Sequence, residues 1–292
     1  MPAKVVSLIN YKGGVGKTTS AVNIAANLAR YYDKKVLLVD GDPQTNATAY
    51  VMNPEMRYIP LQKQGKTLRR VFEECGQLKK SFDIHNLIVE AVVEKDGRKV
   101  LPGLDLLPSD PTLIRAERWL ATTDNQFGVL RKEIEKLRDD YDLVIIDCAP
   151  NIYALTKNCI IASDYYIIPL IPDHLSSIGL ELLVSEIYGF SKNMEDMKPS
   201  MIKLEGVFFT KYRTTTRLHQ QMADNIRDRL ARGIEGTDIQ PGAVKPYDTV
   251  VRDLIAAAEA AQYSLPLCIY KPDSDASKDF ESLTEEFASR LS

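Results

Sequence analysis

The segment NYKGGVGKTT at residues 10–19 constrains the fold of this chain more than any other stretch of its sequence. It follows an apolar run at 4–10 that is typical of a buried strand, and a segment with helical periodicity begins near Lys17. A strand, a glycine-rich turn and a helix in this order predict a βα unit whose loop binds phosphate. The loop departs from the usual pattern G-x-x-x-x-G-K-[ST], because Tyr11 stands where the first glycine is expected.

The residue types in this loop suit a nucleoside triphosphate together with its magnesium ion. Glycines allow the backbone to curl so that successive N–H groups point inward, and the following helix adds the positive end of its dipole. Lys17 supplies a mobile positive charge for the β- and γ-phosphates, the Thr18 hydroxyl is placed to bind Mg²⁺, and Thr19 can reach the α-phosphate. The residues that this pattern predicts to bind ATP are Gly13, Gly14, Val15, Gly16, Lys17, Thr18 and Thr19.

Aspartates follow two further strand-like runs. VDGDPQTNAT at 39–48 places Asp40 and Asp42 one residue apart, and YDLVIIDCAP at 141–150 ends an apolar run at Asp147. The carboxyl ends of parallel strands meet at the edge where ligands bind, so these carboxylates are expected beside the phosphate loop. A carboxylate in the position of Asp147 holds Mg²⁺ in phosphoryl-transfer sites. Asp-Pro is also a common turn, which leaves a structural role open for Asp42.

The rest of the chain alternates short β-branched runs with longer amphipathic segments. This alternation predicts a doubly wound α/β fold, a mostly parallel sheet with helices on both faces, in a single domain of residues 1–292. Strands are predicted at 4–10, 35–40, 104–109, 141–147, 164–171 and 204–210, with a short final strand at 264–270. Helices are predicted at 17–31, 125–139, 175–193, 215–230 and 277–291. The mixed, charged region 50–103 breaks the alternation, and we predict short helices and a small hairpin there, at the edge of the sheet.

Lys12 is a second lysine in the loop, close to Lys17. Two ammonium groups at this spacing repel each other if both serve one phosphate. The spacing alone leaves two interpretations open. Lys12 points into solvent, or it reaches a phosphate that is bound by another subunit.

Three motifs resemble the ParA/MinD family of deviant Walker A ATPases, and most of all its ParA-type partition and cargo-positioning members: KGGVGKTT, VDGDPQTNAT and IIDCAP. The resemblance implies that Lys12 is the signature lysine, which contacts the nucleotide across an ATP-dependent homodimer. It also implies that Asp40 lies near the Mg²⁺ shell and that Asp42 positions the attacking water. Thr45 stands where the family often has glycine. Asp147 matches the family's Walker B aspartate, and Ala149 replaces the first of the two prolines that follow it in the family.

Two later segments resemble the family more weakly. FFTKYRTTTRLHQQM at 208–222 and GAVKPYDTVVRDL at 242–254 are similar to segments that lie near the base in relatives. The ring of Tyr247 is equally consistent with a surface position. IPDHLSSIGLELL at 171–183 is similar to a switch-like stretch near the dimer interface, and we interpret His174 there as a polar loop or interface contact. The residues that the resemblance implies at the base are Thr210, Lys211, Pro246 and Tyr247.

Basic residues are scattered through the last third of the chain, and the net charge of the whole chain is −3. The resemblance to ParA-type proteins implies that an ATP-bound dimer binds DNA without sequence preference, through Lys and Arg side chains that neutralise phosphates. A solvated helix face is the alternative, because Asp224, Asp228 and Asp253 are interspersed. The candidate DNA contacts are Arg213, Arg217, Arg227, Lys245 and Arg252.

The C-terminal segment SKDFESLTEEFASRLS carries an apolar stripe at helical spacing. Its acidic residues outnumber its basic ones, so an anionic membrane would repel it, and we expect it to dock on the body of the domain. No apolar run approaches the roughly 20 residues of a membrane helix. The four cysteines lie far apart, without metal-ligand spacing. We therefore expect a cytoplasmic protein with reduced, buried thiols.

The expected function is slow, Mg²⁺-dependent ATP hydrolysis coupled to dimerisation. The resemblance implies a nucleoid-associated dimer that positions or segregates a cargo, which is a plasmid, a chromosome or a protein compartment such as a carboxysome. A separate ParB-like or adaptor protein would stimulate hydrolysis. Two alternatives are a MinD-like ATPase that cycles on a membrane, and a nucleotide-gated scaffold with negligible turnover. The implied catalytic residues are Lys12, Lys17 and Asp42, and the implied metal site is Thr18, Asp40 and Asp147.

Overall fold

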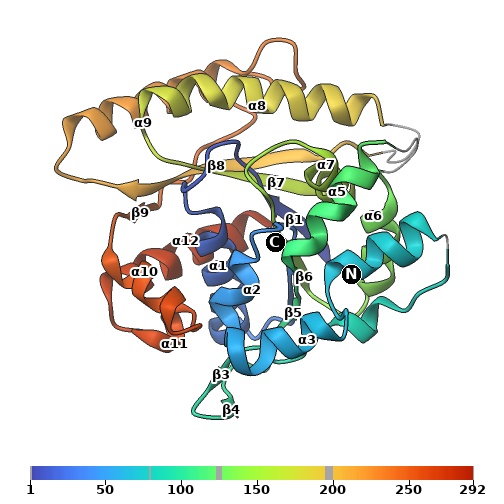
Figure 1. The fold of residues 1–292 in the computed structure, drawn as a ribbon. Coiled ribbons are helices and arrows are strands. Elements are labelled where there is room, and N and C mark those ends of the chain that lie inside the picture. The colour runs from blue at the N-terminus through green and yellow to red at the C-terminus, as the bar shows by residue number, and fades with distance from the viewer. Residues whose placement is uncertain (1, 79, 123–126, 195–199, 292) are drawn as a thin grey trace.

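A seven-stranded parallel sheet forms the centre of the computed structural model, which describes residues 2–78, 80–122, 127–194 and 200–291 (Figure 1). The strand order is β5-β2-β6-β1-β7-β8-β9, and every neighbouring pair runs parallel. Strand β1 lies in the middle of this order, so its loop opens between the two halves of the sheet. The strands are β1 (Lys4–Leu8), β2 (Val36–Asp40), β5 (Leu104–Leu107), β6 (Leu143–Asp147), β7 (Tyr165–Leu170), β8 (Lys203–Tyr212) and β9 (Val250–Arg252).

Alternating apolar side chains of these strands build a separate core on each face of the sheet. Val5 and Leu37 belong to one cluster, and the adjacent Val6 and Leu38 belong to the other. Successive residues of a strand point to opposite faces, so a strand that is covered on both faces needs a continuous apolar run. The apolar runs in the sequence are therefore explained by burial on both sides.

Helices cover both faces and confirm the predicted doubly wound α/β fold. The first core contains residues of α4 (Leu68–Val71), α5 (Ile114–Leu120), α6 (Val129–Ile134), α7 (Ala154–Ala162), α8 (His174–Lys192) and α9 (Arg217–Arg232). The second core contains residues of α1 (Lys17–Tyr31), α2 (Asn46–Val51), α10 (Ile255–Gln262), α11 (Leu267–Tyr270) and α12 (Asp275–Leu291). Figure 1 shows α8 and α9 along one side of β7 and β8, with α1, α10 and α12 on the other side.

Six predicted strands are confirmed with small changes at their ends, and the seventh prediction is wrong. Within 264–270, the residues Leu267–Tyr270 form the single helical turn of α11 after Pro266, and Leu267 and Cys268 are buried in the second core. A short apolar run fits a strand and a buried helical turn equally well, which explains the error. The last strand is instead β9, which the sequence analysis missed because it is only three residues long.

The predicted helices at 17–31, 175–193, 215–230 and 277–291 correspond to α1, α8, α9 and α12. Of the prediction at 125–139, residues 125 and 126 lie outside the described residues. The remainder contains α6, which continues as a tighter helical turn over Glu135–Leu137. These helices follow from the amphipathic pattern of the sequence. In α9, for example, the buried residues recur at helical spacing: Ala223, Ile226 and Leu230.

Region 50–103 consists of short elements next to the edge strand β5, as predicted. It contains α3 (Ile59–Lys63), α4, helical turns at Pro54–Tyr58, Phe72–Gln77 and Ile84–Leu87, and a hairpin of β3 (Glu94–Lys95) and β4 (Arg98–Lys99). The hairpin turns at Asp96 and Gly97, whose φ angles of 52° and 72° suit a tight two-residue turn. Val89 pairs antiparallel with Leu106 of β5, which protects part of the sheet edge.

Helix α12 packs its apolar stripe into the second core, as expected from its acidic character. The Arg290 guanidinium lies 4.0 Å from the ring centroid of Tyr247 and donates hydrogen bonds to two carbonyls of the loop before that ring. Within the described ranges, no helix combines the length and the apolar character that crossing a membrane requires. The buried residues of the stripe are Phe280, Leu283, Phe287 and Leu291.

Leu283 tests the contribution of α12 to the fold, because its side chain is 0% exposed. Leu283→Ala is expected to lower the free energy of unfolding by about 2–5 kcal/mol, through lost burial and the cavity left behind. The measurement is urea denaturation followed by circular dichroism. Glu281→Ala, at an exposed position of the same helix, is the matched control and should change this free energy by less than about 0.5 kcal/mol. Similar losses for both variants would contradict the packing of α12 in the core.

Candidate functional site

Three strand ends meet beneath the glycine-rich loop. The register of the sheet pairs Asp147 at the end of β6 with Leu8 of β1 on one side and with Asp40 of β2 on the other. The loop that follows β1 therefore lies next to both aspartate-bearing strand ends. This arrangement brings together the segments that the sequence analysis assigned to one site.

The loop has the open backbone that anion binding requires. Gly14 and Gly16 have φ angles of 73° and 81°, a region that favours glycine. A Cβ built on Gly13 or Gly14 meets no atom within 4 Å, so the face of the loop is free of protein atoms there. Thr210 supports the loop from behind, because its hydroxyl donates to the Val15 carbonyl at 2.7 Å. We therefore assign Thr210 a structural contact to the loop, in place of the predicted contact to the base.

Lys17 lies inside the loop at the start of α1. Its Nζ donates to the carbonyl oxygens of Asn10 at 3.0 Å and Lys12 at 3.2 Å. Burial lowers the pKa of this ammonium group, and the Asp147 carboxylate acts in the opposite direction. An anion in the loop would offer Lys17 a stronger partner than these carbonyls, because charge-assisted hydrogen bonds are the stronger class.

Asp147 and Thr18 form the part of the site that fits a divalent cation. The Thr18 hydroxyl donates to Asp147 Oδ2 at 2.6 Å, whereas the buried Oδ1 has no hydrogen-bond partner among the described residues. Burial, and after it the neighbouring Asp40, raises the pKa of Asp147 to about 8. A buried carboxylate oxygen without a partner, next to a hydroxyl, is the kind of oxygen pair that Mg²⁺ binds.

The carboxylate of Asp40 is engaged within the protein. Its Oδ2 accepts hydrogen bonds from the Thr48 N–H at 2.8 Å and from the Thr48 hydroxyl at 2.6 Å, and its Oδ1 accepts from the Asp42 N–H at 3.2 Å. Burial raises the pKa of Asp40 to about 7. Asp40 therefore anchors the segment after β2, and Asp147 is the carboxylate that offers a buried oxygen without a partner.

Asp42 lies at the rim of the site, where the chain turns from β2 into α2. Its Oδ1 accepts a hydrogen bond from the Gln44 N–H at 2.9 Å, which is the turn that the Asp-Pro sequence suggested. Burial raises the pKa of Asp42, and Gln44 and Lys17 counteract this effect. Thr45, at the position where the family often has glycine, has a φ of 58° in the left-handed region that glycine tolerates best.

A cavity of about 490 Å³ borders the loop and Asp42. The side of the cavity away from the loop is formed by Tyr50 and by three alanines of α10, which the sequence analysis did not identify. The only signal for them was the alanine-rich run IAAAEAAQ of α10. The residues lining this side are Ala49, Tyr50, Lys211, Ala257, Ala258 and Ala261.

The four residues that were predicted to contact the base do not lie together in the structure. Lys211 lines the cavity, but Pro246 and Tyr247 are not among its lining residues. The Tyr247 side chain is 0% exposed, and its hydroxyl donates to Glu205. A ring that is buried between Arg290 and the second core cannot border a bound base, which corrects the assignment of Tyr247. The alternative of a surface aromatic is wrong for the same reason.

Lys12 and His174 lie on the α8 side of the loop, outside this cavity. Lys12 Nζ forms an ion pair with Asp173, the residue that precedes α8. His174 lines a different hollow between α8 and α9, together with residues such as Glu181 and Arg229. Lys12 thus does not share the position of Lys17 in the loop, and its side chain is only partly exposed.

Acidic partners occupy three of the five candidate DNA contacts. Arg213 pairs with Asp253 and Arg227 with Asp224. Arg252 pairs with carboxylates of α12. Exposed ion pairs are weak, so they do not prevent these arginines from binding phosphate. They do reduce the free energy that phosphate binding would release, because the ion pair must first be broken. The other two candidates are exposed and have no ion pair among the described residues: Arg217 and Lys245.

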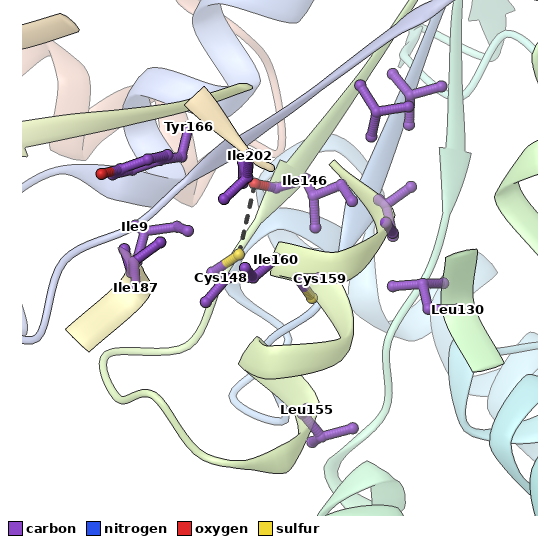
Figure 2. Packing of buried hydrophobic residues seen from close by; sticks show 14 of the residues in the cluster. Ile9, Leu130, Ile146, Cys148, Leu155, Cys159, Ile160, Tyr166, Ile187 and Ile202 are labelled. Carbon is purple, nitrogen blue, oxygen red and sulfur yellow. Dashed lines mark hydrogen bonds between the residues drawn. The ribbon is translucent and has the colours of Figure 1, made fainter. Parts of the chain in front are cut away.

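The cysteines next to the site are packing residues. Figure 2 shows Cys148 and Cys159 among aliphatic side chains, with the Cys148 thiol directed at the Ile146 carbonyl at 4.0 Å. Cys268 is also buried, whereas Cys75 is partly exposed. No group of three or more His, Cys, Asp or Glu side chains in the described part of the chain is arranged to hold a metal ion. A magnesium ion here therefore needs oxygens from the ligand and from water in addition to Thr18 and Asp147.

Comparison with known proteins places these features in a family. The family model described as "AAA domain" matches residues 3–201. The sporulation initiation inhibitor protein Soj of Bacillus subtilis is 30% identical over 287 residues, which cover 98% of both chains. The chromosome partitioning protein ParA of Caulobacter vibrioides is 30% identical over 295 residues, which cover 99% of this chain and 95% of that protein.

Solved structures share the fold at lower sequence identity. Apo McdA from Cyanothece has a TM-score of 0.71 at 18% identity and covers 98% of this chain and 99% of its own. A plasmid partition protein from Borrelia burgdorferi bound to AMPPNP has a TM-score of 0.71 at 21% identity, with 99% of each chain covered. A cobyrinic acid a,c-diamide synthase from Mycobacterium smegmatis with bound ADP and magnesium has a TM-score of 0.68 at 22% identity, covering 99% of this chain and 95% of that one. By its full-length similarity to Soj and ParA, the chain belongs to the ParA/MinD family of deviant Walker A ATPases.

Proposed function

We propose that this protein is a ParA-type ATPase that closes into a homodimer around ATP and hydrolyses it slowly. The observation that carries the proposal is the different placement of the two loop lysines. Lys17 Nζ lies inside the loop on two backbone carbonyls, whereas Lys12 Nζ leaves the loop and contacts Asp173. One subunit therefore has a phosphate site served by Lys17 and a second cation that this site does not use.

The cavity beside the loop is the proposed site of ATP and Mg²⁺. The loop N–H groups and Lys17 would hold the β- and γ-phosphates, and the alanine face of α10 with Lys211 would border the base and sugar. Thr18 and Asp147 would hold Mg²⁺, with Asp40 behind them, and a bound Mg²⁺ neutralises charge on the phosphate oxygens. The structural neighbours that carry AMPPNP, or ADP with magnesium, support this choice of ligand.

Hydrolysis needs a positioned water and a neutralised phosphoryl group more than covalent chemistry. Asp42 lies at the rim of the cavity, where its carboxylate would orient the water. Lys12 of the partner subunit would supply the missing positive charge, in the manner of a residue that completes a site in trans. A site that lacks this charge until two subunits meet accounts for slow turnover.

The proposed cellular role is to position or segregate a cargo from a DNA-bound state. The names of the relatives support partition, because they include chromosome partitioning and plasmid partition proteins. We propose that the ATP-bound dimer binds DNA without sequence preference, led by the exposed Arg217 and Lys245, and associates with the nucleoid. A ParB-like or other adaptor would then stimulate hydrolysis and release the dimer.

A membrane-cycling role has less support. The apolar stripe of α12, which a MinD-like protein would insert into lipid, is buried against α1 in the second core. A nucleotide-gated scaffold differs from the proposed ATPase only in its turnover, so the kinetic experiment below separates these two functions.

Lys12→Ala is expected to leave ATP binding near the wild-type level and to lower the steady-state hydrolysis rate on the order of 10³-fold, because a charge supplied in trans is lost. Asp42→Ala should also abolish turnover while ATP remains bound. The measurements are phosphate release as a function of protein concentration, and binding of a fluorescent ATP analogue. Lys17→Ala is the control that should lose binding itself. Unchanged turnover in both Lys12→Ala and Asp42→Ala would support the scaffold instead.

DNA binding is expected to require ATP and to weaken with salt. Each change removes one cation from each subunit of the dimer, so Arg217→Ala and Lys245→Ala should each reduce the slope of log affinity against log salt by about 2, with no dependence on the DNA sequence. Lys95→Ala, an exposed lysine of the β3–β4 hairpin, is the matched control and should leave the slope unchanged. The measurement is filter binding of an arbitrary duplex with ATP, with ADP and without nucleotide. Equal retention in all three conditions would contradict ATP-gated binding.

Asp147→Asn is expected to stabilise the nucleotide-free protein at alkaline pH. The pKa of Asp147 is about 8 in the fold and close to 4 in an unfolded chain, so the unfolded state releases the proton first and wild-type stability falls as pH rises from about 4 to about 8. Asparagine does not titrate, so the variant does not lose stability in this way as the pH rises. Its melting temperature in EDTA should exceed that of the wild type by several degrees at pH 8.5, with the difference disappearing near pH 4.

The same variant reports on the metal site. Addition of Mg²⁺ to the ATP-bound protein should raise the melting temperature of the wild type by mass action, and it should have little effect on Asp147→Asn. A magnesium-dependent shift of equal size in both proteins would show that Asp147 does not hold the ion.

A further inference from the structure

Helix α10, which borders the proposed base site, is attached to the domain by little apolar burial. All eight residues of this helix are described, and of these Ala260 alone is buried. Ile255, at the start of the helix, is 79% exposed. A buried alanine removes only one methyl group from water, so it fixes a helix weakly. Polar contacts therefore have a large share in setting where α10 lies.

Side-chain hydrogen bonds join α10 and the turn after it to α2. The Tyr50 hydroxyl donates to the Ala257 carbonyl in the first turn of α10 at 3.0 Å. Just beyond the end of the helix, the Ser264 hydroxyl donates to the Ala49 carbonyl at 2.9 Å. Figure 1 shows α10 and α11 beside α1 and α2. Helix α10 is thus bound to α2 near both of its ends.

The direction of the Tyr50 hydroxyl is set by Asn23 of α1. Asn23 Oδ1 accepts a hydrogen bond from the Leu267 N–H at 2.8 Å, which distinguishes the oxygen of this amide from its nitrogen. Its Nδ2 donates to the Thr19 carbonyl at 2.7 Å and to the Tyr50 oxygen at 3.3 Å. Because the Tyr50 oxygen accepts from Asn23, its own proton is directed to the Ala257 carbonyl.

These contacts connect the two ends of the proposed nucleotide site. Asn23 lies on the helix that follows the phosphate loop, and Tyr50 lines the cavity beside α10. Asn23 and Tyr50 are 0% and 3% exposed, so water does not compete for their hydrogen bonds. Burial raises the pKa of Tyr50 to about 12, and the hydroxyl therefore keeps its proton at neutral pH. The position of α10 relative to the loop depends on this buried chain of contacts.

We propose that Tyr50 is a positioning residue that holds α10 against the nucleoside part of the bound nucleotide and thereby sets the affinity for that part. This inference rests on the proposed function, in which α10 borders the base and sugar. The alanines of α10 offer a ligand only methyl groups, whose attraction falls steeply with distance, so the contact depends on how closely the helix is held. The phosphates bind the loop and Lys17 instead, and their binding does not depend on α10.

The contribution of one hydrogen bond sets the size of the expected effect. A neutral hydrogen bond within a protein changes an equilibrium constant by roughly 2- to 10-fold. When α10 leaves the position that borders the nucleoside in part of the molecules, the apparent affinity falls in proportion to the fraction that keeps it. Loss of the Tyr50 hydroxyl is therefore expected to weaken nucleotide binding roughly 2- to 10-fold.

Tyr50→Phe removes the hydroxyl and keeps the ring that lines the cavity. Tyr263→Phe is the matched control, because Tyr263 directly follows α10 and is 64% exposed. Its ring stacks on Tyr270, and phenylalanine preserves that contact. The control thus removes a hydroxyl at the other end of the same helix and leaves the contacts between α10 and α2 intact.

The contact itself is tested without ligand, by hydrogen exchange of the full-length protein measured by mass spectrometry. Tyr50→Phe should increase exchange roughly 2- to 10-fold in a peptide that covers residues 255–262, and it should leave a peptide from α12 unchanged. Tyr263→Phe should change neither peptide. Unchanged exchange of α10 in Tyr50→Phe would show that the hydroxyl does not hold the helix, and the proposal would be overturned.

The consequence is tested by titration calorimetry with ADP and with pyrophosphate, each in the presence of Mg²⁺. Pyrophosphate carries two phosphates without the nucleoside, and ADP is not a substrate of the proposed hydrolysis. Tyr50→Phe should raise the dissociation constant of ADP roughly 2- to 10-fold and leave that of pyrophosphate unchanged, and Tyr263→Phe should change neither. An equal increase for both ligands would mean that the change acts through the phosphate loop, which overturns the proposed role.

The wild type separates this inference from the proposed function. If it binds ADP more tightly than pyrophosphate and Tyr50→Phe alters neither constant, the proposed nucleotide site stands and the role of Tyr50 is wrong. If the wild type binds ADP no more tightly than pyrophosphate, the nucleoside does not contact α10. That result would overturn both this inference and the placement of the base in the proposed function.

Discussion

The pairing of β2 with β6 is the constraint on which the rest of the site depends, because it sets Asp40 directly beside Asp147. Burial raises the pKa of both carboxylates at these adjacent strand ends, and the neighbouring Asp40 raises the pKa of Asp147 further. The two carboxylates differ in their hydrogen bonds. Thr48 and the Asp42 N–H satisfy Asp40, whereas Asp147 receives one hydrogen bond from Thr18 and keeps an oxygen without a partner among the described residues. This asymmetry leaves one carboxylate free to meet a cation and uses the other to hold the loop that carries Asp42.

The two lysines of the loop likewise differ in their surroundings. Lys17 follows the turn at Gly16 into α1 and stays under the loop, where backbone carbonyls surround its ammonium group. Lys12 precedes the glycines and is turned toward α8, where Asp173 receives it. Because Lys12 Nζ pairs with Asp173 and Lys17 Nζ lies on backbone carbonyls of the loop, the two ammonium groups have different partners. The proposed dimer uses this difference, since only Lys12 faces away from its own site.

The surroundings of the proposed base site show why local resemblance was an incomplete guide. Thr210, Lys211 and Tyr247 were expected to act together, but they lie behind the loop, at the cavity and within the second core, respectively. Lys211 follows Thr210 in β8 with a φ of 48°, which is outside regular strand geometry, and Gly206 on the same strand leaves room for the Tyr247 ring. The alanines of α10 that border the cavity carry no polar group to announce a site. They line the cavity because α10 packs against α2, and no short motif encodes that contact.

Continuous apolar runs and glycine spacing are local signals with a direct physical meaning, so the parallel sheet, the phosphate loop and the strand ends that carry Asp40, Asp42 and Asp147 could be predicted from the sequence. The sequence did not determine the helical turn at Leu267–Tyr270 or the three residues of β9, since so short a run fits a strand and a helix alike. The packing of the whole fold sets which carboxylate keeps an oxygen without a partner among the described residues, where Tyr247 is buried and which residue pairs with Lys12. These outcomes depend on contacts between segments far apart in the chain, such as the one between Lys12 and Asp173, and local sequence patterns carry no information about them.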